Sequence, residues 1–194
     1  MLDSIISLNG TSVKGKVACK MAVSAFLIAL AVILPQLVHV ILGQPGGVKW
    51  LPMYLPVLIG GCLLGTRWAF FVGMMSPLVS FIVTSSMGEA MPNEERLPFM
   101  MFELAVFAAV SGAFSEKIIK NALWAFAAVI TAQLAGRLTF LGIVFIFREH
   151  IQLAPAMVWS QIQAGMPGII LQLALVPLFA ILLRGIFLKE NVHD

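Results

Sequence analysis

The chain has 194 residues, of which 60% are hydrophobic and only 11% are charged, and its mean hydropathy is +1.00. Soluble domains have about a quarter of their residues charged, so this composition excludes an ordinary soluble protein and predicts an integral membrane protein. The net charge of +3 does not indicate nucleic acid as a partner. The apolar runs are continuous rather than alternating, which excludes a transmembrane β-barrel.

Taken in chain order, the apolar runs predict an all-α membrane protein, a six-transmembrane-helix bundle forming one domain over residues 1–194. A helix of about 20 residues crosses the bilayer. The first run ends at residues 43–47, which we expect to form a turn, and the longer loops fall at 86–97 and 148–161. The second run is short and bounded by prolines and glycines, so we expect a short or broken second helix. The predicted spans are 17–42, 51–64, 68–85, 98–114, 122–147 and 162–187.

Basic residues are distributed unevenly between the two sets of loops, and this predicts the orientation of the bundle. With the N-terminus inside, the outer loops hold three basic residues and several glutamates. Because cytoplasmic loops carry an excess of Lys and Arg, both the N- and C-termini are predicted to be cytoplasmic. Eight of the twelve Lys and Arg residues then lie on the cytoplasmic side: Lys14, Lys16, Lys20, Arg67, Lys117, Lys120, Arg184 and Lys189.

Two charged residues, Glu103 and Arg137, interrupt long apolar runs. A charge at bilayer depth costs at least about 2.5–3.5 kcal/mol, so it usually faces a cavity or a partner. The two residues together predict a polar cavity with a role in binding or transport; the alternative is a structural ion pair that locks two helices. Gln133 shares a helix face with Arg137, and Gln172 is a further amide in an apolar run. Since a buried amide needs a partner, we expect these four groups to converge.

Residues of the types that bind ligands are concentrated in the predicted outer loops. The aromatic side chains there would form either an interfacial anchoring belt or the walls around a flat organic ligand. His39 and His150 would face one outer pocket, or each would hydrogen-bond to a loop carbonyl. The candidate substrate-binding residues of this region are His39, Lys49, Trp50, Tyr54, Asn93, Trp159 and Gln163, with Glu94, Arg96 and Gln161 beside them.

The sequence contains no motif for nucleotide binding or hydrolysis, neither a Walker A segment nor GxSxG. The three histidines do not have the spacing of zinc ligands, so no metal site is predicted. We therefore expect no cofactor for this chain and no ATPase activity of its own.

Small residues recur along the first predicted span, at Ala18, Ala22, Ala25 and Ala29. Two pairs of these alanines are spaced four residues apart, and this spacing lets another helix approach closely. The pattern predicts a docking surface for a partner membrane protein, with Ala22, Ala25 and Ala29 as its candidate residues.

These features combine into a recognisable pattern. Besides the six-span layout and the alanine spacing, it includes Trp50-Leu-Pro-Met-Tyr-Leu-Pro-Val-Leu-Ile-Gly-Gly61, Ser76-Pro-Leu-Val-Ser80, Pro98-Phe-Met-Met-Phe-Glu-Leu-Ala105, Gly136-Arg137 and Gly165-Met-Pro-Gly-Ile169. Over nearly its whole length the chain resembles the substrate-binding S components of energy-coupling-factor (ECF) vitamin transporters. It is most similar to the broad branch that includes pantothenate-type S components.

The resemblance implies a multi-pass protein of a prokaryotic plasma membrane that binds a water-soluble vitamin or vitamin precursor from outside. It implies docking through the alanine surface onto a transmembrane coupling protein that carries two ATPase subunits, whose ATP hydrolysis drives release of the ligand inside. In this scheme Glu103 and Arg137 either contact the ligand or frame its site. The lid would be formed near residues 43–50, 86–97 and 148–161.

The sequence leaves several ligands and several classes of function open. Arg137 and Lys49 suit a carboxylate or phosphate, as in pantothenate. The tryptophans suit a pyrimidine, a benzimidazole nucleoside or a corrinoid, and His39 or His150 could ligate the metal of a tetrapyrrole. The alternatives to an S component are a structural or assembly protein, a self-contained secondary transporter, and a small membrane enzyme that uses Glu103, His39 and Arg137. No inverted repeat and no dense polar cluster favours the last two.

Overall fold

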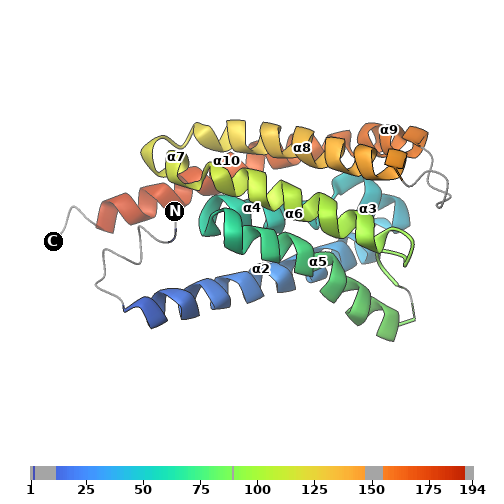
Figure 1. Cartoon of the computed structure of the whole chain (residues 1–194), viewed down its shortest axis with the longest axis horizontal. Helices are drawn as coiled ribbons and strands as arrows, with labels where there is room; N and C mark the ends of the chain where they lie inside the picture. Colours follow the sequence, from blue (N-terminus) through green and yellow to red (C-terminus); the bar gives the residue numbers. More distant parts are fainter. Residues whose placement is uncertain (1, 3–11, 89, 147–154, 191–194) are drawn as a thin grey trace.

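The structure is a computed structural model that describes residue 2 and residues 12–88, 90–146 and 155–190. Within these ranges every regular element is a helix (Figure 1). In the described part of the chain, three short helices lie between longer ones, and they fall at both ends of the bundle. In chain order the helices are α2 (Val13–Leu42), α3 (Gln44–Trp50), α4 (Tyr54–Leu64), α5 (Thr66–Ser86), α6 (Leu97–Ala113), α7 (Ser115–Lys120), α8 (Trp124–Ile146), α9 (Pro155–Ala164) and α10 (Met166–Glu190).

The helix lengths confirm an all-α membrane bundle. Five segments of the described chain are long and apolar enough to cross a membrane, and the 17-residue α6 is a shorter apolar helix between them. The second span is broken as expected: α3 ends where Leu51 adopts a left-handed conformation with φ 48°, and α4 begins at Tyr54. The first span, α2, begins at Val13, and the hydroxyl of Ser12 caps the helix by accepting from the amide of Gly15 at 3.3 Å.

Three expectations about boundaries were wrong. Residues 43–47 do not form a simple turn, because Gly43, with φ 71°, ends α2 and α3 starts directly after it. The predicted span 162–187 is split at Gly165, so residues 162–164 belong to α9 and the membrane helix α10 starts at Met166. Pro167 explains this break, since a proline lacks an amide hydrogen and is best accommodated in the first turn of a helix. The expected loop at 148–161 is helical from Pro155; residues 147–154 lie outside the described chain.

Helix α6 forms the centre of the bundle and packs against α4, α5 and α8 (Figure 1). Glycines allow these close contacts. A Cβ atom at Gly73 of α5 would overlap the Leu104 carbonyl group, and one at Gly61 of α4 would overlap the Ser111 side chain. The core around α6 includes the fully buried side chain of Phe107. Small residues at such crossings are typical of membrane helices, where close packing rather than hydrophobic burial drives association.

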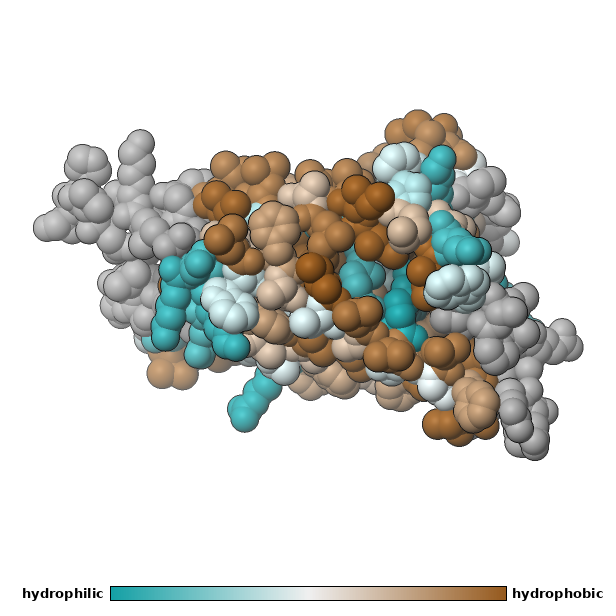
Figure 2. Space-filling model, turned by 90° about the horizontal axis from the view of Figure 1, so that it is seen from above, coloured by the Kyte–Doolittle hydropathy of each residue, from teal (hydrophilic) through white to brown (hydrophobic). Residues whose placement is uncertain are grey.

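The bundle has two distinct ends. The helices α3 and α9 lie at one end, at the right of Figure 1, while α2 begins, α7 lies and α10 ends toward the other. On the face shown in Figure 2, hydrophobic residues cover most of the side of the bundle and most hydrophilic residues lie toward its ends. This distribution fits a molecule whose long axis crosses the bilayer.

Candidate functional site

A cavity of about 360 Å³ lies at the end of the bundle that carries α3 and α9. Its walls come from the last turns of α2, from α3 and the start of α4, from the 91–96 loop, and from α5, α6, α8 and α9. It reaches the surface, because Val48 and Asn93 in its lining are exposed. The lining residues are Pro35, His39, Gly47, Val48, Leu51, Pro52, Met53, Tyr54, Ser80, Met91, Pro92, Asn93, Arg96, Met100, Glu103, Phe140 and Gln161.

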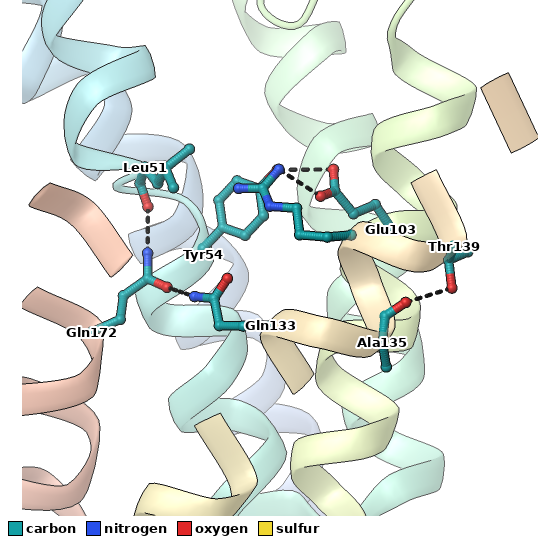
Figure 3. Close-up of polar contacts among 8 residues, drawn as sticks. Leu51, Tyr54, Glu103, Gln133, Ala135, Thr139 and Gln172 are labelled. Atoms are coloured by element: carbon teal, nitrogen blue, oxygen red, sulfur yellow. Dashed lines mark hydrogen bonds and ion pairs between the residues drawn. The ribbon is translucent and has the colours of Figure 1, made fainter. Parts of the chain in front are cut away.

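Glu103 forms the polar floor of this cavity and is held by two donors. The Arg137 Nη1 atom donates to Glu103 Oε1 at 2.8 Å, and the Tyr54 hydroxyl donates to Oε2 at 2.9 Å. The side chain of Tyr54 extends from α4 toward Glu103 (Figure 3). Glu103 is 2% exposed and Arg137 is 8% exposed. The guanidinium carbon of Arg137 also lies 5.2 Å from the ring centroid of Tyr54, within the range of a cation–π contact. This cluster joins α4, α6 and α8.

A second polar chain lies beside this cluster and consists of two amides. Gln133 of α8 donates from Nε2 to Oε1 of Gln172 of α10, and Gln172 donates from Nε2 to the Leu51 carbonyl at 3.3 Å (Figure 3). Because the Leu51 carbonyl can only accept, it fixes the orientation of both amides. The break between α3 and α4 exposes that carbonyl, and Gln172 supplies one of its partners away from water. The amide chain therefore fastens the broken second span to α8 and α10.

The four groups expected to converge thus form two neighbouring buried networks instead of one open polar site. Of the four, Glu103 lines the cavity; Arg137, Gln133 and Gln172 lie behind the wall. Arg137 is both an ion-pair partner and a support for the cavity floor. The ion pair can therefore both lock the helices together and frame the cavity, so the two hypotheses about Glu103 and Arg137 are compatible.

The candidates in the outer loops divide into two groups. His39, Tyr54, Asn93, Arg96 and Gln161 line the cavity. His39 packs its ring against the backbone of Gly47, and its buried Nδ1 has no hydrogen-bond partner in the described chain. The remaining candidates do not line the cavity: the half-buried Trp50 and the exposed Lys49, Glu94, Trp159 and Gln163. His150 lies outside the described residues.

Several lining residues were not among the candidate site residues that the sequence suggested. Three methionines, Met53, Met91 and Met100, contribute a flexible apolar wall, and Phe140 of α8 contributes an aromatic one. Ser80 of α5 also lines the cavity and donates its hydroxyl to the Met91 carbonyl at 2.8 Å, which fixes the 91–96 loop against α5. Methionine in an apolar run carries no signal that separates a cavity wall from ordinary core packing.

The alanines of α2 lie on one exposed face. Ala18, Ala22, Ala25 and Ala29 are all solvent-accessible in the isolated chain, whereas Leu27, between them, is buried against the bundle. This small-residue face is therefore available to another protein or to lipid.

The amide chain predicts a measurable stability effect. Replacing Gln172 with leucine leaves the buried amide of Gln133 without its acceptor, so we expect a loss of about 1–3 kcal/mol. For a protein of this size that is a fall in Tm of roughly 2–12 °C in a detergent melt. Replacing Gln133 with leucine as well should restore part of the loss, and Gln163→Leu on the surface of α9 should change little. A melt of Gln172→Leu that matches the wild type would contradict this role.

Comparison with known proteins assigns the family. Residues 19–180 match the family described as ECF transporter, substrate-specific component, which covers most of the chain. No curated protein and no solved structure gives a significant match. Members of this family are the substrate-binding membrane subunits of transporters, not enzymes, and work with a membrane coupling protein and ATPases. The chain, with its apolar membrane-spanning helices, therefore belongs to the substrate-specific S components of ECF transporters.

Proposed function

We propose that this S component binds a small water-soluble vitamin or vitamin precursor in the cavity at the α3–α9 end. The observation that carries the proposal is the cavity itself, about 360 Å³, with an apolar wall and a few convergent polar groups. Ligand sites commonly have this composition and range from about 300 to 1,000 Å³, so this one lies at the small end. A pantothenate-sized molecule or a single pyrimidine fits this volume better than a corrinoid or another tetrapyrrole.

We infer the orientation of the bundle from the charge pattern together with the position of the cavity. The ends of α2 and α10 that carry Lys14, Lys16 and Lys189 lie opposite the cavity. With those basic ends in the cytoplasm of a prokaryotic cell, the cavity faces outward and collects its ligand from outside. The α3 helix, the 91–96 loop and α9 surround its mouth and are the candidate lid.

Release into the cell requires partners, because this chain carries no ATPase motif. In this proposal the exposed alanine face of α2 docks onto a transmembrane coupling protein that carries two ATPase subunits. The face fits that role because Ala22, Ala25 and Ala29 present little side-chain bulk toward the membrane. ATP hydrolysis on the partners would then drive release of the ligand.

The binding site is tested by filling the cavity. The purified protein is screened by native mass spectrometry, with thermal-shift confirmation, against a panel of water-soluble vitamins and precursors. Val48→Trp should weaken binding of the retained compound at least tenfold, because Val48 lines the cavity mouth.

The matched control is Val83→Trp. Val83 of α5 lies outside the lining and is 40% exposed, close to the 43% of Val48, so the two positions differ mainly in their distance from the cavity. We expect Val83→Trp to bind normally. If folded wild-type protein retains no compound from the panel, or if Val48→Trp binds as well as the wild type, the cavity is not the substrate site.

A further inference from the structure

The charges that line the cavity do not balance. Among the Lys, Arg, Asp and Glu side chains that the structure describes, two line the cavity: Arg96 and Glu103. Both oxygens of Glu103 already accept hydrogen bonds, and its negative charge is paired with Arg137 behind the wall. Arg96 has no ion pair with any residue that the structure describes. The cavity therefore offers one uncompensated positive charge to whatever enters it.

We propose that Arg96 binds an anionic group of the transported molecule, so that the substrate is a small organic carboxylate. The inference rests on the proposed function, because it takes this cavity to be the substrate site. A guanidinium group donates two parallel hydrogen bonds to a carboxylate, which gives both affinity and orientation. Arg96 is half-buried, so its charge is less screened than that of an exposed arginine.

The position of Arg96 in the fold supports the same ligand chemistry. It is the residue immediately before α6, a helix of 17 residues whose first turn has no side-chain cap. The N-terminal end of a helix carries a partial positive charge, which adds to that of the guanidinium group. The rest of the wall would hold the body of the ligand, since Met53, Met91 and Met100 present flexible thioether chains.

This assignment differs from the candidates that the sequence favoured for an anion. Arg137 does not line the cavity and its charge is already matched by Glu103. The side chain of Lys49 is exposed and lies outside the lining. Among the Lys and Arg side chains that the structure describes, Arg96 is the one that lines the cavity.

The experiment compares acids with their neutral analogues on the full-length protein in detergent. The probes are three matched pairs: pantothenate and pantothenol, nicotinate and nicotinamide, and biotin and biotinamide. We expect at least one acid to bind tenfold or more tightly than its neutral partner, since a hydrogen bond between charged groups changes the affinity by about that factor. Arg96→Gln should remove this preference by weakening the acid and sparing the neutral analogue, and Arg96→Lys should retain part of it.

Arg67→Gln is the matched control, because Arg67 is exposed at the start of α5, at the opposite end of that helix from the cavity. It should leave every affinity unchanged. The inference is overturned if Arg96→Gln binds the acid as tightly as the wild type, or if no acid is preferred over its neutral analogue. Retention of an uncharged or cationic vitamin alone would overturn it and leave the proposed function intact. Failure of the folded protein to retain any vitamin or precursor would remove both.

Discussion

Replacing Glu103 with alanine should destabilise the protein by about 3–5 kcal/mol, the usual effect of breaking a buried ion pair. The change leaves the Arg137 guanidinium buried without its anion, and it removes the acceptor of the Tyr54 hydroxyl. Since the cluster joins three helices, the loss should appear as global unfolding at lower temperature. A thermal melt of the detergent-purified variant should show a Tm lowered by roughly 6–20 °C.

A double-mutant cycle separates the pair from its surroundings. Arg137→Ala alone should be similarly unstable, because it leaves the Glu103 carboxylate buried and unpaired. The double variant should lose clearly less than the sum of the two single losses, since neither charge is then stranded. Glu94→Ala, in the exposed part of the 91–96 loop, should stay within about 0.5 kcal/mol of the wild type. A Glu103→Ala protein as stable as the wild type would show that the ion pair does not hold α6 to α8.

The buried pair was predictable from sequence because its signal is local. A charge inside an apolar run is expensive at bilayer depth, so Glu103 and Arg137 are conspicuous in the sequence alone. The same reasoning predicted an all-α membrane bundle, since length and hydropathy belong to each segment itself. It did not predict α3 or the break at Gly165, because a few glycines and prolines can form a turn, a short helix or a helix start according to what packs against them.

The cavity was less predictable for a different reason. Loop residues were chosen by their chemical type, but their direction depends on how the helices pack. Asn93 lines the cavity, whereas Trp159 and Gln163 lie outside it. The methionine wall gave no sequence signal, because the hydropathy of a methionine is the same in a core and in a cavity. Arg96 could not be singled out from sequence, because only the structure shows that Arg137 is paired with Glu103 and that Arg96 is not paired with a described residue.

Replacing Ala25 or Ala29 with tryptophan should abolish transport while leaving ligand binding intact. Both alanines are exposed on α2 and neither lines the cavity, so an indole group there disturbs neither the core nor the proposed ligand site. It would, however, separate α2 from a closely packed partner helix, since small residues permit such an approach and large ones prevent it. Uptake of labelled ligand by cells that express the complete transporter should fall to background.

The control for this prediction is the same substitution to tryptophan at an exposed position on another helix. Leu138 of α8 is exposed and lies outside the cavity lining, so Leu138→Trp should transport normally. Co-purification of the coupling protein with each variant locates the defect: Ala25→Trp and Ala29→Trp should lose the partner, and Leu138→Trp should keep it. Normal uptake by both alanine variants would remove α2 as the docking surface. Loss of uptake with the partner still bound would place the defect after docking, in the step that releases the ligand.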